Sequence, residues 1–185
     1  MLELIGLGTD PDAVTDAARR LGATAYINHP GESDKRPYSA MLRVATDDVE
    51  AVREVSDVGL YVAFGRVVKA PSGDHPPERV IAAFGLVRHP DLTHRQADDH
   101  WRDVHGPLAL VNHAAMCDYS QLSVVATLAG DPLDGLALCA FDSRQSLREK
   151  FFNDDDARAV IEADVATFAD PANSPRRVVL EQAVG

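Results

Sequence analysis

Hydrophobic and polar residues form two successive copies of one pattern, the first within residues 1–70. A short apolar or alternating run predicts a strand, whereas apolar residues three and four apart predict a helix with one buried face. In chain order the pattern predicts a strand over 2–7, a helix over about 11–21, strands over 24–28 and 38–45 joined by turn-forming residues 29–34, a helix after Asp47 and Asp48, and a strand over 59–68. The predicted order is βαββαβ.

The second copy begins after residue 78 and has longer helices. It predicts a strand over 80–87, a helical region over 93–115, strands over 119–127 and 135–141, a second helical region over 147–168 and a last strand over 177–183. The stretch Asn153-Asp154-Asp155-Asp156 interrupts the second helical region, and we interpret its acidic residues as the cap of a new helix. The predicted buried stripe of that helix consists of Ala159, Val160, Ala163 and Ala166 or Thr167.

A proline-rich segment separates the two copies. Ala70 to Glu78 contains three prolines and a glycine, which is typical of a linker. We therefore divide the chain into an N-terminal repeat at 1–70, a linker at 71–78 and a second repeat at 79–185. Because an antiparallel sheet with helices on one face needs cover on the other, we expect both sheets to pack into one closed or nearly closed assembly.

The charge balance restricts the classes of partner that we expect the chain to bind. Against 18 Lys and Arg stand 29 Asp and Glu, a formal net charge of −11, which disfavours nucleic acids and anionic membrane surfaces. Neither an apolar run long enough to span a bilayer nor a basic N-terminal segment is present, so we expect a cytoplasmic protein without a membrane partner. Cys117 and Cys139 form no CxxC pair, and we interpret both as buried thiols.

Titratable and aromatic side chains are concentrated in one stretch, from His100 to Leu108, followed by Asn112, His113 and Tyr119. Trp101 and His105 are four residues apart and so share a helix face. Gly106 and Pro107 are predicted to break or kink the helix directly after the histidine.

The motif Trp101-x3-His105-Gly106-Pro107-Leu108 resembles that of the EthD family, in the dimeric α+β barrel superfamily. The approach Pro90-Asp91-Leu92-Thr93 and the later Phe168-Ala169-Asp170 are also similar to the family pattern, so the resemblance covers about Arg79 to the C-terminus. It implies an α+β fold in which a ferredoxin-like βαββαβ unit occurs twice and the antiparallel sheets pack as a barrel, the N-terminal half being a degenerate copy. One departure is His100, where relatives commonly have an aromatic residue before the tryptophan.

The resemblance and the residue chemistry together suggest roles. His105 is our candidate general acid/base, because an imidazole with a pKa near 6.5 both accepts and donates protons at neutral pH. His113 and Tyr119 are candidate catalytic partners. The candidate substrate-binding residues are Trp101, His100, Asn112 and Leu108. The alternatives are a structural histidine at a helix end, a partly exposed helix residue for His113 and an edge-of-core tyrosine for Tyr119.

Several cofactor signatures are missing from the sequence. His89, His94 and His100 do not have the spacing of metal ligands, and Gly6-Leu7-Gly8 lacks the third glycine of a nucleotide-binding loop. No Gly-x-Ser-x-Gly elbow of a serine hydrolase occurs either. We therefore predict neither a transition metal nor a nucleotide cofactor.

These observations favour a cofactor-independent lyase, isomerase or cyclase. The EthD family includes proteins associated with ether degradation, lactone isomerases and polyketide cyclases or dehydratases. We predict acid/base catalysis by His105 on a small apolar or aromatic, carbonyl-bearing metabolite. Two alternatives stay open: a non-catalytic protein that binds a hydrophobic metabolite, and a monooxygenase of the same superfamily, with or without haem. Whether the chain forms a homodimer is also left open.

Overall fold

The computed structural model describes residues 1–29, 36–71 and 79–185. The first half contains β1 (Leu2–Gly8), α1 (Pro11–Leu21), β2 (Thr24–Asn28), β3 (Ala40–Val44), α2 (Val49–Arg53) and β4 (Gly59–Lys69). The second half contains β5 (Val80–Leu86), α3 (His94–His100), a π-helical turn η1 (Trp101–His105), α4 (Gly106–Asn112), β6 (Met116–Gly130), β7 (Gly135–Phe141), α5 (Arg144–Glu149), α6 (Asp155–Phe168) and β8 (Val178–Val184). Residues 30–34 of the predicted turn and 72–78 of the predicted linker lie outside the described residues.

The eight strands close into a barrel in the order β1-β3-β2-β8-β5-β7-β6-β4, and every pair is antiparallel. Each half contributes four neighbouring strands in the equivalent order, β4-β1-β3-β2 and β8-β5-β7-β6. The two ferredoxin-like sheets therefore meet edge to edge, through β2 with β8 and β4 with β6. Pairing both edges satisfies backbone groups that would otherwise be exposed. The predicted α+β barrel fold is confirmed.

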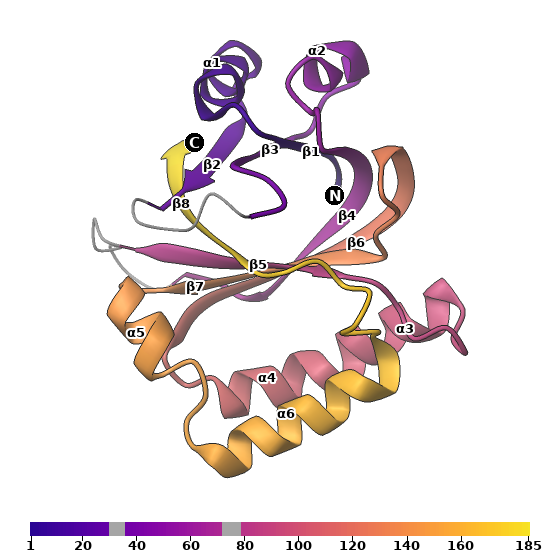
Figure 1. Ribbon diagram of the computed structural model, residues 1–185, viewed down its shortest axis with the longest axis vertical. Helices are drawn as coiled ribbons and strands as arrows, with labels where there is room; N and C mark the ends of the chain where they lie inside the picture. The colour runs from indigo at the N-terminus through magenta and orange to yellow at the C-terminus, as the bar shows by residue number, and fades with distance from the viewer. Residues whose placement is uncertain (30–35, 72–78) are drawn as a thin grey trace.

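One hydrophobic core fills the barrel and draws on both halves. Its fully or nearly fully buried members include Ile5, Leu7, Met41, Leu122, Leu136 and Leu180. The helices lie outside the barrel, with α1 and α2 over one side and α3, α4 and α6 over the opposite side (Figure 1). The division into repeats at 1–70 and 79–185 stays an interpretation, since the two halves share this core.

The helix layer of the first half packs tightly on its sheet. A side-chain carbon at Gly6 would lie 2.2 Å from the Ser56 hydroxyl oxygen, and one at Gly8 would lie 2.4 Å from the Val55 carbonyl oxygen. These two glycines therefore allow α2 to approach β1 directly.

The helix of the second half does not break at Gly106-Pro107, but the regular α-helix is interrupted there by a π turn. His105 and Gly106 both have right-handed helical angles, and α3, η1 and α4 follow one another without interruption. The Gly106 N–H bonds to the Trp101 carbonyl five residues earlier, which makes η1 a π turn. The wider turn gives room to the Pro107 ring, which would clash with a carbonyl in a regular α-helix.

The predicted stripe of α6 is wrong, although the helix begins as predicted after the Asp154 cap. All five residues of that stripe are exposed, whereas Ala157, Ile161 and Phe168 are buried. The sheet buries the face that carries the largest apolar side chains, because they remove the most apolar area from water.

Two smaller predictions concern the cysteines and the membrane. Both thiols are free, with Cys139 buried and Cys117 only half-buried. No helix in the described ranges is long and apolar enough to cross a membrane.

Candidate functional site

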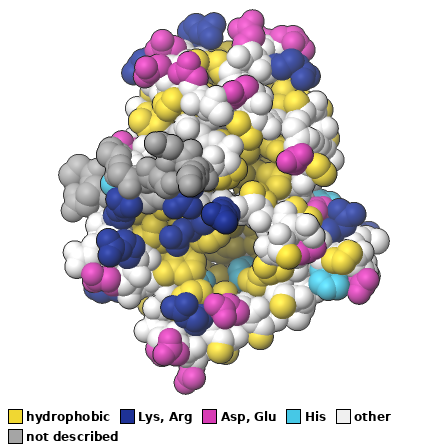
Figure 2. Space-filling model, viewed as in Figure 1, with side chains coloured by type: hydrophobic (Ala, Val, Ile, Leu, Met, Phe, Trp, Pro, Cys, Tyr) yellow, Lys and Arg dark blue, Asp and Glu magenta, His cyan; other side chains and the backbone are white. Residues whose placement is uncertain are grey.

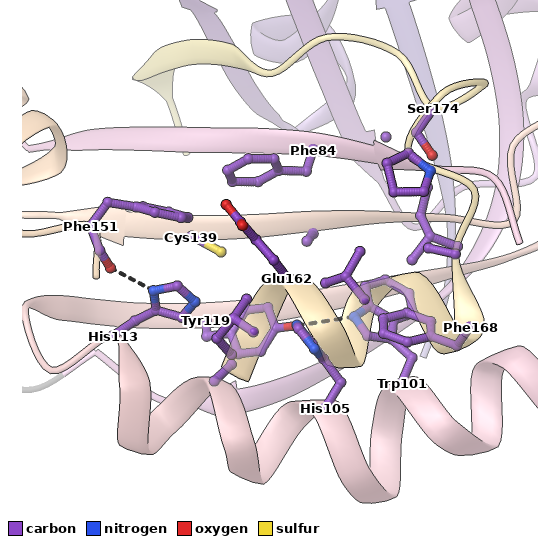
Figure 3. Close-up of a pocket in the computed structure, with 18 of the residues that line it drawn as sticks. Phe84, Trp101, His105, His113, Tyr119, Cys139, Phe151, Glu162, Phe168 and Ser174 are labelled. Carbon is purple, nitrogen blue, oxygen red and sulfur yellow. Dashed lines mark hydrogen bonds between the residues drawn. The ribbon is translucent and has the colours of Figure 1, made fainter. Parts of the chain in front are cut away.

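A cavity of about 470 Å³ lies between the outer face of the second half's sheet and the helical segments η1, α4 and α6 (Figure 3). Its walls are mainly apolar, and six aromatic side chains contribute to them: Phe84, Trp101, Tyr119, Phe151, Phe152 and Phe168. Figure 2 shows the hollow open to one face, with hydrophobic and histidine side chains inside and Lys and Arg gathered along one side. The volume falls in the range of about 300–1,000 Å³ that is usual for small-molecule sites.

His105 extends from the π turn into the wall of this cavity and is buried. Its Nδ1 lies 2.8 Å from Oδ2 of Asp164 on α6. A carboxylate only accepts, so Nδ1 carries the proton of the neutral ring and Nε2 keeps a lone pair. Burial lowers the pKa of His105, and the hydrogen bond that His105 donates to Asp164 partly opposes this effect. The neutral imidazole is thus a base at neutral pH.

Asp164 holds two histidines at once. Its other oxygen, Oδ1, lies 2.8 Å from Nε2 of His100, and the rings of both histidines lie 5.1 Å from the Phe168 ring, centroid to centroid. The sequence analysis missed this residue. A signal was present, because Asp164 interrupts the face formed by Ala157, Ile161 and Phe168 with a carboxylate.

Tyr119, on β6, is fully buried and its hydroxyl accepts two hydrogen bonds. Trp101 Nε1 donates over 3.1 Å and Gln121 Nε2 over 2.9 Å. Among the described residues no acceptor is found for the hydroxyl's own proton. Burial raises the pKa of Tyr119, so the phenol stays protonated and remains a donor.

The positions of Trp101 and Gln121 are themselves determined by a polar network behind the cavity. Gln121 also donates to the Trp101 carbonyl over 3.0 Å and accepts from Arg66 Nε over 2.8 Å. Arg66 lies over the Trp101 ring and forms a two-point ion pair with Asp98. This network joins β4, β6 and α3 behind Tyr119.

His113, the cap residue at the end of α4, also lines the cavity. Its Nδ1 donates to the Phe151 carbonyl over 2.5 Å, and its ring lies against Phe151 and Phe152. As in His105, Nε2 is left with a lone pair. Burial lowers the pKa of His113 as well, and His105 adds to that effect.

Three predicted binding residues are not among the cavity-lining side chains. Asn112 donates to the Leu108 carbonyl of its own helix over 2.9 Å. Leu108 packs against the apolar cluster beside the cavity, and His100 contacts Asp164 instead. The structure thus brings His105, His113, Tyr119 and Trp101 to one cavity and leaves Asn112, Leu108 and His100 outside its wall.

The sequence analysis also missed cavity residues from distant segments. Cys139, Glu162 and Arg176 line the cavity, the last two with exposed side chains. Burial raises the pKa of Cys139 to about 12, so its thiol stays protonated. Within the described ranges, no group of three or more His, Cys, Asp or Glu side chains is arranged to hold a metal ion.

Comparison with known proteins gives a family match for part of the chain. Residues 89–172 match the model of the EthD domain. No curated protein matches the sequence.

Solved structures match over nearly the whole chain. An anthrone oxidase-like protein has a TM-score of 0.57 at 12% identity, with 98% of this chain and 90% of that chain covered. A proposed monooxygenase from Fusobacterium nucleatum has a TM-score of 0.58 at 8% identity, with 98% and 91% covered. A mutant chlorite dismutase from Candidatus Nitrospira defluvii, in complex with cyanide, has a TM-score of 0.54 at 11% identity, with 98% and 90% covered. At such identities the likeness shows the fold alone.

Proposed function

Because residues 89–172 form an EthD domain in a chain of the dimeric α+β barrel superfamily, we propose that this protein is a cofactor-independent acid/base enzyme. Its substrate would be a small aromatic or carbonyl-bearing molecule held in the cavity. One observation carries the proposal. His105, which is hydrogen-bonded to Asp164, stands at the wall of an apolar cavity that Tyr119 also lines.

His105 would remove a proton from the substrate. Its Nε2 has a free lone pair, while Asp164 holds the ring in one tautomer and stabilises the imidazolium that forms. The apolar walls exclude water, which strengthens this charge interaction. An orienting carboxylate behind a base is the arrangement that proton-transfer enzymes use repeatedly.

Tyr119 would donate its hydroxyl proton to the substrate oxygen on which negative charge develops. Trp101 and Gln121 hold the phenol in place before the substrate arrives, so little reorganisation is needed. His113 would offer a second lone pair farther along the cavity, as an acceptor for a substrate hydroxyl group. Lyases, isomerases and cyclases share this first step, in which a C–H or O–H proton leaves next to a carbonyl.

A second candidate is an oxygenase, favoured by the descriptions of two structural neighbours as anthrone oxidase-like and as a monooxygenase. The same deprotonated substrate would then supply electrons to O₂. Oxygen uptake that depends on substrate would identify this activity, and a Soret absorption band in the purified protein would identify a haem form. The third candidate is a protein that binds a hydrophobic metabolite without converting it.

Proton exchange tests the acid/base step before the natural substrate is known. The probe is 2-tetralone, a bicyclic ketone with acidic α-hydrogens, whose exchange in D₂O is followed by NMR. We expect the protein to accelerate exchange and His105→Asn to reduce the acceleration about 10²–10⁴-fold, with probe affinity retained. Bound probe without exchange or oxygen uptake would support the binding protein instead.

The matched control is His94→Asn. His94 is a partly exposed histidine on α3 that pairs with Asp134 and does not line the cavity. Its replacement changes the same residue type on the same helical segment. Exchange should therefore proceed at the wild-type rate in His94→Asn.

A further inference from the structure

We infer that His100 is a positioning residue for His105, because the two histidines share the carboxylate of Asp164 and compete for its charge. The inference rests on the proposed acid/base function, which makes the basicity of His105 important. No part of the EthD match assigns a role to the trio of His100, Asp164 and His105. His100 would act through Asp164, without touching the substrate.

The geometry is that of one carboxylate between two imidazoles. Each oxygen of Asp164 lies 2.8 Å from one histidine nitrogen, Oδ1 from His100 Nε2 and Oδ2 from His105 Nδ1. Phe168 contacts both rings and restricts their motion. The three side chains therefore behave as one unit.

Exposure differs along the trio. The side chain of His105 is 11% exposed and that of Asp164 is 12% exposed, whereas that of His100 is 28% exposed. His100 is thus the member of the trio that water reaches best. Once His100 is charged, it attracts the Asp164 carboxylate, and less of that negative charge remains to stabilise an imidazolium at His105.

The electrostatics of His105 agree with this arrangement. Burial lowers the pKa of His105 most, the hydrogen bond and charge of Asp164 raise it, and His100 lowers it. The consequence is that His105 stays an unprotonated base over a wider pH range than it would beside Asp164 alone.

Other charged or titratable groups lie near the trio. On the same helical segment, Asp99 and Asp103 are paired with Arg102. The groups on the elements packed around the trio are Glu162 on α6, His113 on α4, Tyr119 on β6 and Arg176 before β8. Among the charged and titratable side chains in the part of the chain that the structure describes, only Asp164 contacts both His100 and His105.

The test is to measure the titration of His105 directly, by ¹⁵N NMR of histidine-labelled protein without any ligand. His100→Gln keeps a polar group beside Asp164 but cannot become charged, whereas His100→Lys is charged throughout. We expect the titration midpoint of His105 to rise in the order His100→Lys, wild type, His100→Gln. The two variants should differ by about one pH unit, or about tenfold in proton affinity.

A second background separates the electrostatic effect from any structural disturbance caused by the substitutions at position 100. In an Asp164→Asn background the carboxylate is gone, so exchanging lysine for glutamine at position 100 should move the His105 midpoint far less. His94→Gln is the matched control and should leave the midpoint unchanged, since His94 pairs with Asp134. Equal midpoints in His100→Lys and His100→Gln would overturn the inference.

The outcome is separable from that of the proposed function. Proton exchange on 2-tetralone with equal midpoints would keep the acid/base enzyme and reject the role of His100. The expected order of midpoints without exchange, oxygen uptake or product would keep the coupled trio and reject the enzyme. Where both hold, the acidic limb of the rate profile should move to higher pH in His100→Gln.

Discussion

Replacing Tyr119 by phenylalanine removes one oxygen atom that accepts two buried hydrogen bonds. Trp101 Nε1 donates over 3.1 Å and Gln121 Nε2 over 2.9 Å, and both donor side chains are buried, at 2% and 0% exposure. Each donor left without a partner costs about 1–3 kcal/mol, so Tyr119→Phe should lose about 2–6 kcal/mol of unfolding free energy. In a chain of this size that lowers Tm by at least about 4 °C.

Two other tyrosines provide matched controls for thermal and urea unfolding. Tyr61 donates a single hydrogen bond to the Asp131 carbonyl over 2.9 Å, so Tyr61→Phe should lose about 1 kcal/mol. The buried hydroxyl of Tyr38 has no partner among the described residues, so Tyr38→Phe should be neutral or stabilising. If Tyr119→Phe is as stable as Tyr38→Phe, the phenol does not accept the two buried donors.

The same substitution also tests catalysis. Measured well below its Tm, Tyr119→Phe should reduce proton exchange on the probe about 10²–10³-fold, which is the usual effect of losing one oxyanion donor. Probe affinity should change far less, because phenylalanine keeps the aromatic wall. An unchanged exchange rate in a folded variant would remove Tyr119 from the mechanism and leave it a structural role.

Three further predictions follow from the same site. Asp164→Asn should slow probe exchange by at least about tenfold, because the amide no longer stabilises the His105 imidazolium; wild-type kinetics would contradict the pairing. Burial lowers the pKa of His105 and His113, so the unfolded chain binds more protons than the folded chain at acidic pH. The contribution of the two neutral histidines to stability should therefore be complete above about pH 6.5 and fall as the pH drops through their lowered pKa values. Thermal unfolding of a His105→Asn/His113→Asn variant should accordingly show a flatter pH dependence than the wild type. A side-chain carbon at Gly135 would lie 2.5 Å from the Trp101 ring. Gly135→Ala should therefore lower the free energy of unfolding by about 1–3 kcal/mol and weaken probe binding. Unchanged probe affinity would show that the position of the Trp101 ring does not matter for binding.

The sequence by itself determined the order of elements and most of their ends. These depend on short-range signals, such as the carboxylates that cap helices at Asp10, Asp48 and Asp154. The Trp101-x3-His105-Gly106-Pro107 motif also indicated the EthD domain, whose model matches residues 89–172, and a segment that lines the cavity. Local propensity and a contiguous motif are properties of neighbouring residues, so they can be read without coordinates.

Local sequence signals were insufficient where the conformation or the buried face of a helix depends on its packing against other elements. The sequence predicts a break or kink at Gly106-Pro107, whereas the helical segment continues there through a π turn. The buried face of α6 was misassigned for a similar reason, because Ala159 and Val160 fit a helical stripe as well as Ala157 and Ile161 do. Only contact with the sheet decides which stripe is buried.

The composition of the site was decided by the tertiary structure. Asp164 is 59 residues from His105, and the Phe151 carbonyl is 38 residues from His113, so neither partner has a signature at short range. Barrel closure and the packing of α6 against η1 and α4 bring these groups together. A histidine motif can thus be recognised in the sequence, but the tautomer and basicity of each histidine depend on burial and on partners that only the folded chain supplies.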